Sequence, residues 1–325
     1  MPVDAWPRVA VLGAGAVGCY FGGMLARAGV PVTLIGRPHH IDAISRHGLR
    51  LESLNFQEHI PVAVSVDVAG AREADVVLFC VKTVDNEETA MSLARHLTPG
   101  AVVMSFQNGV DNVERIRAAA GIDAVPTAVY VAAAMAGPGH VRHTGRGDLV
   151  IGHPRGGAQV DLNALVGLFA HAGVPCVISA NIEAELWTKM SLNCAYNAIS
   201  ALGRAKYGRV AQSPWVREIL RLAVEETVAV AGAAGVRLSA DALIAGAFKL
   251  SQAMPEATSS TAQDIERGKR TEIDSLNGYI ARRGAELGIP TPVNQTLHAL
   301  VKLLEEPFSP ETTGHGVLPS TAAGK

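Results

Sequence analysis

The sequence is poor in charged and aromatic residues. Only 18% of its 325 residues are charged and 5% are aromatic, and 28 basic residues against 30 acidic residues give a net charge of -2. Nucleic-acid-binding proteins need a basic surface, often with interleaved aromatic side chains, and no such cluster occurs in this sequence. We therefore expect no nucleic-acid partner.

Cysteine is also scarce, and its few positions are scattered. Cys19, Cys80, Cys176 and Cys194 lie in apolar contexts and form no C-x-x-C pair. Disulfide frameworks and zinc sites need cysteines that are paired or closely spaced. We therefore interpret these four as small buried residues in a reducing compartment, and we expect no metal site.

Long hydrophobic runs are absent as well. No apolar run is long enough to cross a bilayer, and residues 1–7 lack the basic and apolar regions of a signal peptide. Hydrophobic residues nevertheless make up 48% of the chain, which is enough for a large core, and 325 residues favour two domains. We expect a soluble, cytoplasmic protein with no membrane contact.

A glycine-rich loop near the N-terminus connects a predicted strand with a predicted helix. The apolar run 8–12 is followed by G-x-G-x-x-G and then by a helical pattern over 19–27. The first glycine permits a tight turn, the second lets a pyrophosphate approach the backbone, and the third lets helix and strand pack closely. A glycine-rich turn without a ligand is the alternative, but the strand–turn–helix context favours dinucleotide binding. The predicted cofactor contacts in this loop are Gly13, Gly15, Ala16, Val17 and Gly18.

The end of the second predicted strand indicates which dinucleotide binds. An NAD site usually has an acid here, which binds the ribose 2′-hydroxyl. The strand 32–35 is followed instead by Gly36 and Arg37, and a guanidinium suits a 2′-phosphate. NADPH is therefore the expected cofactor, with a solvent-exposed loop arginine as the alternative. His39 and His40 are more typical of a loop or helix start than of a metal pair.

More strands of a parallel sheet are predicted further along the chain. Apolar runs that predict strands occur at 75–81, 101–106 and 176–178, with β-type runs in 126–152 and helical patterns at 86–97 and 160–172. Ligands of open α/β sheets bind at the carboxyl ends of the strands, where Lys82 and Asn108 fall. Asn-Gly is also a common turn pair, so Asn108 could equally be a turn residue.

The sequence changes character near residue 180. From Ile182 onward the pattern is almost wholly helical and rich in Ala and Leu. We therefore predict an α/β Rossmann-type domain over 1–179 and an all-α domain over 180–305. The tail 306–325 is rich in Pro, Ser, Thr and Gly, and we expect it to be disordered.

One helix of the second domain carries an unusual polar face. Over 186–197 a helix would place Lys189, Asn193 and Asn197 on one face, with apolar residues over most of the rest. Burying these groups without partners would cost several kcal/mol, so they should point into a polar cleft. An ammonium between two amides can hold an oxyanion or donate a proton to it. The alternative is a lysine that reaches out to solvent beside two satisfied core asparagines.

Taken together, the motifs resemble the ketopantoate reductase (2-dehydropantoate 2-reductase) family, up to about residue 305. The matching segments are Gly13-x-Gly15-x-x-Gly18, Cys80-Val81-Lys82, Gln107-Asn108-Gly109, Glu185-Leu186-Trp187-x-Lys189-x-x-x-Asn193-Cys194, Ser259-Ser260 and Thr271-Glu272-Ile273-Asp274-x-x-Asn277-Gly278. The combination is specific, whereas each piece alone is not. The resemblance implies NADPH-dependent reduction of a 2-keto acid to an (R)-2-hydroxy acid. It also implies a cleft between a Rossmann domain and a helical domain of the 6-phosphogluconate dehydrogenase type.

The resemblance further implies roles for individual residues. Lys189 would be the catalytic acid, which suits the alkoxide that hydride transfer leaves on the 2-keto carbon. Glu272 would contact the substrate, and it is suited to accept from a substrate hydroxyl or to orient Lys189. The other implied substrate contacts are Asn108, Asn193, Asn197 and Ser260. The implied contacts to the phosphate and ribose region of NADPH are Arg37 and Lys82, and Asn108 would also meet the cofactor.

Two positions depart from the best-known members of that family. Tyr207 stands where those members have an asparagine that binds ketopantoate, and Ala198 stands where they have proline. A large ring would narrow the pocket, whereas Glu272 would still provide an acceptor for the hydroxyl of ketopantoate. Reduction of ketopantoate to pantoate, a step of pantothenate biosynthesis, is therefore the expected reaction. A branched or aromatic 2-keto acid is the alternative substrate.

Two other classes of protein would share part of this pattern. A β-hydroxyacid dehydrogenase would share the two domains and a Lys-x-x-x-Asn helix, but it would not need the motif at 271–274. A non-catalytic NADP-sensing protein could lack both Lys189 and Glu272, and both are present. An enzyme with a small 2-keto acid as its partner is therefore favoured, with a homodimer as a possible assembly.

Overall fold

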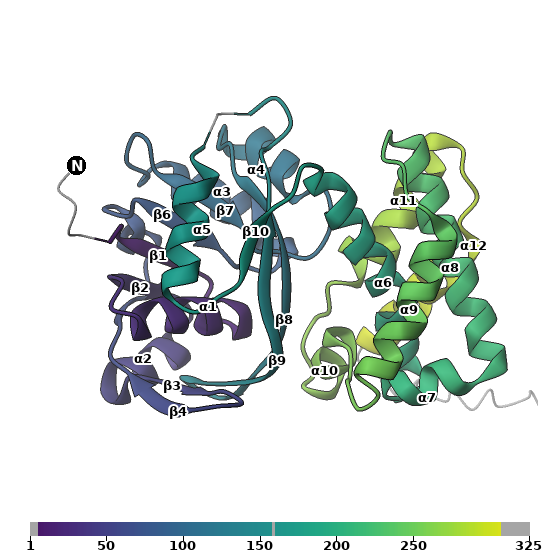
Figure 1. Cartoon of the computed structure of the whole chain (residues 1–325), viewed down its shortest axis with the longest axis horizontal. Coiled ribbons are helices and arrows are strands. Elements are labelled where there is room, and N and C mark those ends of the chain that lie inside the picture. Colours follow the sequence, from purple (N-terminus) through teal and green to yellow (C-terminus); the bar gives the residue numbers. More distant parts are fainter. Residues whose placement is uncertain (1–5, 158–159, 307–325) are drawn as a thin grey trace, which may run out of the picture.

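The computed structural model describes residues 6–157 and 160–306, and it consists of a sheet domain followed by a helical domain. Figure 1 shows the sheet domain in purple to teal and the helical domain in green and yellow, side by side along the longest axis. This is the fold class that the sequence predicts. The predicted boundary after residue 179 falls between the last strand, β10 (Cys176–Ile178), and the long helix α6 (Ile182–Leu202).

Within the described residues, ten strands form one sheet. Their order is β4-β3-β9-β8-β7-β6-β1-β2-β5, and β10 pairs with β9. The run from β5 through β2, β1, β6 and β7 to β8 is parallel throughout, which is the strand order of dinucleotide-binding folds. The other strand bounds are β1 Val9–Leu12, β2 Val32–Ile35, β3 Leu49–Glu52, β4 Gln57–Ile60, β5 Ala63–Ser65, β6 Val76–Phe79, β7 Val102–Ser105, β8 Val125–Gly137 and β9 His140–Ile151.

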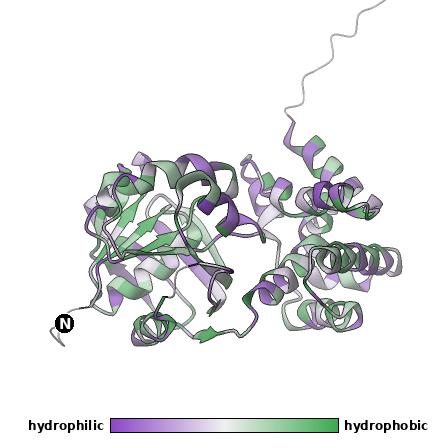
Figure 2. Cartoon of the chain, turned by 90° about the horizontal axis from the view of Figure 1, so that it is seen from above, coloured by the Kyte–Doolittle hydropathy of each residue, from purple (hydrophilic) through white to green (hydrophobic). Residues whose placement is uncertain are grey.

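The central strands are apolar on both faces because helices cover both sides of the sheet. Val9 and Val11 of β1 belong to one core cluster, whereas Ala10 and Leu12 belong to a second cluster on the opposite face. Figure 2 shows the largely hydrophobic strands in the middle of this domain, among helices of mixed hydropathy. The helices of this domain are α1 Ala16–Arg27, α2 Pro38–His47, α3 Asn86–Ala94, α4 Asn112–Ala120 and α5 Leu162–His171, with short 3-10 helices η1 Val68–Ala71 and η2 Thr83–Asp85.

The β-type runs predicted in 126–152 form the long antiparallel hairpin of β8 and β9. The chain turns between them at Gly139, which has a φ of 65°. His143 of β9 stacks on Tyr20 with ring centres 4.3 Å apart, and its Nδ1 lies 2.9 Å from the hydroxyl of Ser53. Both strands contact α6. The hairpin is therefore one of the parts of the sheet domain that contact the helical domain (Figure 1).

The helical domain is built around α6. No residue of α6 is exposed, and the helix contacts α8, α10 and α12, which confirms the prediction of a helix buried on nearly all sides. Residues 182–306, all of which the structure describes, contain no strand. The other elements of this domain are α7 Tyr207–Gln212, α8 Pro214–Ala233, α9 Ala240–Ala253, α10 Ser260–Glu266, η3 Ile273–Ser275, α11 Asn277–Leu287 and α12 Pro292–Glu305.

The charged segment 267–278 is not one continuous helix, because α10 ends at Glu266 and the chain continues as a loop into η3. Its first charges, Arg267, Lys269 and Arg270, are exposed. Asp274, by contrast, accepts hydrogen bonds from His298 Nε2 at 2.7 Å and from Lys302 Nζ at 3.1 Å. The second half of the segment therefore packs against its neighbours, and it presents Glu272 to the sheet domain.

The remaining sequence predictions concern cysteines, membrane spans and the tail. All four cysteines are free, and Cys80 is the only one of them that is partly exposed. Among the described residues, no helix is both long and apolar enough to span a bilayer. The predicted disorder of the tail concerns residues that, from 307 onward, lie outside the described part of the chain.

Candidate active site

The ammonium group of Lys189 on α6 is the centre of the candidate site. The side chain of Asn181 caps the start of α6 by accepting from the backbone N–H of Ala184 at 3.1 Å. The helix then continues without a break, so Lys189, Asn193 and Asn197 follow one another along one face, as the sequence predicts.

The surroundings of Lys189 change its acidity. The pKa of Lys189 is lowered to about 8, mainly because the ammonium group is buried. The positive charge of Arg146 lowers this pKa further, whereas the carboxylate of Glu272 raises it. The Lys189 Nζ also lies 5.9 Å from the centre of the Tyr130 ring on β8. An ammonium with a pKa near neutral is still protonated at neutral pH, yet it releases its proton more readily than an ordinary lysine.

Asn108 connects Lys189 to Glu272. Asn108 Oδ1 accepts from Lys189 Nζ at 2.9 Å, and Asn108 Nδ2 donates to Glu272 Oε2 at 3.0 Å. An ammonium can only donate and a carboxylate can only accept, so the two partners together fix the orientation of the amide. Asn112 Nδ2 donates to the backbone carbonyl of Asn108 at 2.7 Å. Asn108 is therefore both a turn residue and a member of the site.

The second carboxylate oxygen of Glu272 is held by Thr83, the first residue of η2. Glu272 Oε1 accepts from the Thr83 backbone N–H at 3.2 Å and from the Thr83 hydroxyl at 3.3 Å. Thr83 is fully buried, and its hydroxyl accepts from Ser275 Oγ at 2.7 Å. Sequence analysis missed Thr83 and Ser275. The available signal was the place of Thr83 directly after Lys82 at the carboxyl end of β6.

Lys82 makes a second connection between the domains. Its Nζ donates to Asp264 Oδ2 at 2.9 Å and to the backbone carbonyl of Arg270 at 2.6 Å. Burial raises the pKa of Asp264, and the Lys82 ammonium opposes that change. In this structure the Lys82 ammonium thus contacts the helical domain, and its contact with a cofactor stays a prediction.

The predicted substrate contacts on the helical domain lie together. Asn197 Nδ2 donates to Ser260 Oγ at 3.4 Å, and Ser259 Oγ, the cap of α10, donates to the Asn197 carbonyl at 3.1 Å. The partly buried side chain of Asn193, one turn before Asn197, makes no hydrogen bond within the described residues. Asn193 and Asn197 follow Lys189 along the same face of α6, and Ser260 at the start of α10 lies beside Asn197.

Tyr207 packs in the core of the helical domain. Its ring lies on Tyr196 with centres 4.5 Å apart, and burial raises the pKa of Tyr207 to about 12. Its backbone N–H donates to the carbonyl of Ala257 at 3.0 Å. Tyr207 thus supports the loop that leads to Ser260. The predicted narrowing of the substrate pocket by this ring stays untested.

The glycine-rich loop has the shape that a dinucleotide requires. Gly13 has a φ of 114°, and a Cβ there would lie 2.7 Å from the carbonyl carbon of Cys80 in the loop after β6. A Cβ at Gly18 would lie 2.2 Å from the Gly13 oxygen, whereas a Cβ at Gly15 would meet nothing within 4 Å.

The backbone at Gly15 therefore faces open space at the start of α1. No side chain caps this helix, and its first turn comprises Ala16, Val17 and Gly18. The first N–H groups of a helix have no partner within the helix, so they can bind a phosphate. This arrangement fits the pyrophosphate of a nicotinamide dinucleotide.

Arg37 lies at the end of β2, where the sequence predicts contact with a 2′-phosphate. It is exposed, it precedes Pro38 at the start of α2, and no acidic side chain of the described residues pairs with it. His39 and His40 lie in the first turn of α2, so the prediction of a helix start is confirmed.

Sequence analysis also missed Tyr130 and Arg146 on the β8–β9 hairpin. The Arg146 guanidinium lies 4.1 Å from the centre of the Tyr130 ring, and Arg146 has a φ of 49° at a β-bulge. No motif marks either residue. The bulge shifts the pairing register, and alternation along the strand cannot reveal such a shift.

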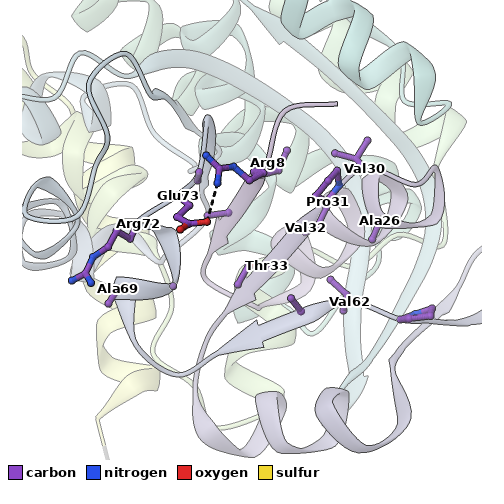
Figure 3. A pocket seen from close by; sticks show the side chains of 16 residues that line it. Arg8, Ala26, Val30, Pro31, Val32, Thr33, Val62, Ala69, Arg72 and Glu73 are labelled. Atoms are coloured by element: carbon purple, nitrogen blue, oxygen red, sulfur yellow. Dashed lines mark hydrogen bonds and ion pairs between the residues drawn. The ribbon is translucent and has the colours of Figure 1, made fainter. Parts of the chain in front are cut away.

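A separate cavity of about 640 Å³ lies at the amino ends of β1, β2 and β5. Figure 3 shows this cavity with Val30 and Val62 in its lining, beside the ion pair of Arg8 and Glu73. In this pair, Arg8 Nη1 lies 2.8 Å from Glu73 Oε2. Lys82 and Asn108 follow the carboxyl ends of their strands, at the opposite end of the parallel sheet. This cavity is therefore distinct from the candidate active site.

A glycine-rich loop of the dinucleotide-binding type, in a sheet domain that contacts a helical domain through a buried lysine, is typical of a two-domain nicotinamide-dependent oxidoreductase. Residues 9–156 match the family "Ketopantoate reductase PanE/ApbA", and residues 181–305 match "Ketopantoate reductase PanE/ApbA C terminal". The chain therefore belongs to the ketopantoate reductase family.

Individual relatives agree with this assignment. The chain is similar to the 2-dehydropantoate 2-reductase of Halobacterium salinarum, with 32% identity over 92% of this chain and 99% of that protein. It is 33% identical to the enzyme of the same name from Pyrococcus horikoshii, over 92% of this chain and 97% of that one.

Solved structures extend the comparison. The structure of a PanE/ApbA family ketopantoate reductase from Ralstonia eutropha JMP134 is 49% identical and covers 92% of this chain and 98% of that one, with a TM-score of 0.86. A D-mandelate dehydrogenase with NADH and anilino(oxo)acetate has the same fold, with a TM-score of 0.86, 23% identity and coverage of 92% and 98%.

Proposed function

We propose that this protein reduces a 2-keto acid to an (R)-2-hydroxy acid with NADPH, with ketopantoate as its preferred substrate and Lys189 as the general acid. The observation that carries the proposal is the hydrogen-bonded chain from Lys189 through Asn108 to Glu272. This chain lies at the carboxyl ends of the parallel strands, where open α/β sheets bind their ligands.

The proposed chemistry needs a proton donor at the substrate carbonyl. NADPH, when bound, supplies the hydride to the carbonyl carbon. Lys189 gives its proton to the oxygen that becomes the hydroxyl, and its lowered pKa makes that transfer easier. Asn108 Oδ1 holds Nζ in place, and the Glu272 carboxylate, one hydrogen bond further on, keeps the buried ammonium charged.

The remaining polar groups are suited to hold the substrate. Asn193, Asn197 and Ser260 offer donors to a carboxylate and a carbonyl. Both oxygens of Glu272 already accept hydrogen bonds, but a carboxylate oxygen has a second lone pair for the hydroxyl of ketopantoate. A substrate hydroxyl that meets no acceptor is rejected strongly, whereas an apolar contact discriminates by only about 1–3 kcal/mol.

The proposed preference for NADPH depends on Arg37. Arg37→Ala should weaken the binding of NADPH and leave that of NADH nearly unchanged, because only NADPH carries a 2′-phosphate. Titration of both cofactors into the wild type and the variant checks this. Equal losses for both cofactors, or a wild type that prefers NADH, would contradict the preference for NADPH.

An NADPH-oxidation assay over a panel of 2-keto acids tests the substrate. Since a D-mandelate dehydrogenase of this fold was solved with anilino(oxo)acetate, the panel should include aromatic and branched acids beside ketopantoate. We expect the highest kcat/KM for ketopantoate. The analogue that lacks the hydroxyl should be poorer in the wild type, and Glu272→Gln should narrow the difference. A wild type that prefers the analogue would overturn the substrate and leave the reductase activity intact.

A further inference from the structure

We propose that Arg146 on the β8–β9 hairpin binds the carboxylate of the substrate, with Tyr130 as the surface on which its guanidinium rests. This proposal rests on the 2-keto acid reductase function proposed above. A 2-keto acid carries its carboxylate directly beside its carbonyl. Asn193, Asn197 and Ser260 offer that carboxylate neutral donors only, so a site with a lysine at the carbonyl gains affinity from a positive group nearby. Arg146 is such a group.

The position of Arg146 connects it to Lys189 through one aromatic ring. The guanidinium carbon lies 4.1 Å from the centre of the Tyr130 ring, and Lys189 Nζ lies 5.9 Å from the same centre. The two cations are close enough for the charge of Arg146 to lower the pKa of Lys189. Two positive groups close to one ring produce a positive local potential, which favours an anion.

The backbone at Arg146 has a strained conformation. Arg146 has a φ of 49°, which side chains other than glycine rarely adopt. The register of β8 and β9 shifts between Tyr130 and Val131, opposite this residue, which marks a β-bulge. Bulges near active sites redirect side chains, and strained residues persist where the surrounding structure holds them. Here the bulge turns Arg146 onto Tyr130.

The guanidinium retains donors for a ligand. Asp148 accepts from Nε of Arg146 at 3.0 Å and from Nη2 at 2.6 Å. An arginine has five N–H groups in a rigid fork, so three of them stay free for a second carboxylate. Asp148 thus fixes the plane of the guanidinium without using up its donors. The Arg146 side chain is 47% exposed, so a substrate can reach it.

Arg146→Gly tests the assignment without disturbing the backbone, because glycine adopts a positive φ without strain. The KM of the variant for the preferred 2-keto acid should rise roughly 10- to 100-fold, the scale of a charged hydrogen bond. Its KM for NADPH should stay unchanged. The methyl ester of the same acid, which has no carboxylate charge, should show no such loss. Arg146→Lys should restore part of the affinity, since it keeps the charge and loses the fork.

Arg142→Ala is the matched control. Arg142 lies on the same strand and forms a similar bidentate pair, with Glu52, but it does not act on Lys189. Its loss should leave both KM values unchanged. Equal losses for acid and ester in Arg146→Gly, or a loss in KM for NADPH alone, would overturn the assignment.

Calorimetry separates this assignment from the proposed function. The 2-keto acid is titrated into wild type and Arg146→Gly, each preloaded with NADP⁺, so that no turnover is needed. If the 2-keto acid binds to wild type more tightly than to Arg146→Gly, but wild type reduces no acid of the panel, the proposed function is overturned and the role of Arg146 is not. Equal binding by both proteins would overturn the role of Arg146, whatever the activity.

Discussion

Two of the polar connections between the sheet domain and the helical domain differ in kind. The inner connection runs from Lys189 through Asn108 and Glu272 to Thr83, by hydrogen bonds among buried or partly buried groups. The outer connection is the ion pair of Lys82 with Asp264, whose side chains are 37% and 19% exposed. Both start from loops at the carboxyl ends of parallel strands: the inner one reaches Lys189 on α6 and Glu272 after α10, and the outer one reaches Asp264 on α10.

This difference in burial indicates which of the two connections supports catalysis. Water screens an ion pair with exposed members, so it typically contributes about 0–1 kcal/mol. Breaking a buried hydrogen-bonded chain destabilises the fold more, because each buried polar group left without a partner costs about 1–3 kcal/mol or more. Such a chain also holds a titratable group at a defined pKa. We therefore expect catalysis to depend on the inner connection, and domain closure or cofactor affinity to depend on the outer one.

The largest effect should come from removing the titrating group of the inner connection. Lys189→Ala should lower kcat for 2-keto acid reduction by about 10²-fold or more, the usual scale of general acid catalysis. NADPH binding should survive, because the glycine-rich loop is in the other domain. Lys249→Ala, at an exposed lysine of α9, is the control and should have normal kcat. Near-normal turnover of Lys189→Ala would make Lys189 a structural residue.

A smaller effect should follow when the charge of Glu272 is removed. Reduction requires protonated Lys189, so kcat should fall as the pH rises through about 8. The Glu272 carboxylate raises the pKa of Lys189 and Arg146 lowers it. Glu272→Gln should therefore move the fall in kcat to lower pH, and Arg146→Gly should move it to higher pH. At a fixed pH above the pKa, lowering the pKa by one leaves about a tenth as much protonated lysine. If the pH profiles of kcat for both variants shift in the same direction, the opposite effects of Glu272 and Arg146 on the pKa of Lys189 are contradicted.

Thr83 should have a more moderate influence, because it acts through Glu272. Thr83→Val keeps the volume but removes the hydroxyl between Glu272 and Ser275, which should destabilise the fold by about 1–3 kcal/mol. The pH dependence of kcat should also change, and Thr83→Ser should restore it. Thr227→Val, which removes a buried hydroxyl bonded within α8 at 2.8 Å, should destabilise the fold and leave the pH dependence unchanged. Denaturant unfolding and pH profiles of all three variants separate stability from positioning.

The smallest effect on stability is expected at the outer connection. Lys82→Ala and Asp264→Asn should each change the free energy of unfolding by about 0–1 kcal/mol. Only Lys82→Ala should raise the KM for NADPH, if Lys82 reaches the cofactor as predicted. Equal KM changes in the two variants would instead assign the ion pair to domain closure.

The sequence predicts those parts of the site that depend on local order. The glycine-rich loop is contiguous, and the polar face of α6 follows from the helical period, so both could be predicted before the structure. The pairing of Thr83 with Glu272 joins residues 189 positions apart, and that of Lys82 with Asp264 spans 182 positions. Neither pairing produces a periodic signal. The family resemblance located Glu272, and the structure shows what it contacts.

The bulge on β9 was also beyond prediction. A strand pattern assumes that side chains alternate between the two faces, and one extra residue breaks that rule without a consistent mark in the sequence. Arg146 and Tyr130 thus come together only in three dimensions. The sequence also did not indicate that the Tyr207 ring packs on Tyr196, and the predicted effect of this ring on the substrate pocket stays a prediction.

The contact between Gly13 and the loop after β6 has a genetic consequence. A Cβ at Gly13 would meet backbone atoms of Cys80 at 2.7 and 2.8 Å, and its φ of 114° disfavours any side chain. At Gly23 of α1, by contrast, a Cβ would meet only the ends of the Leu49 and Leu51 side chains within 3 Å. A Gly23→Ala defect could therefore be suppressed by shortening Leu49 or Leu51 to valine. For Gly13→Ala no side-chain change at the site of collision can act as a suppressor, so a selection for revertants should return the original glycine codon.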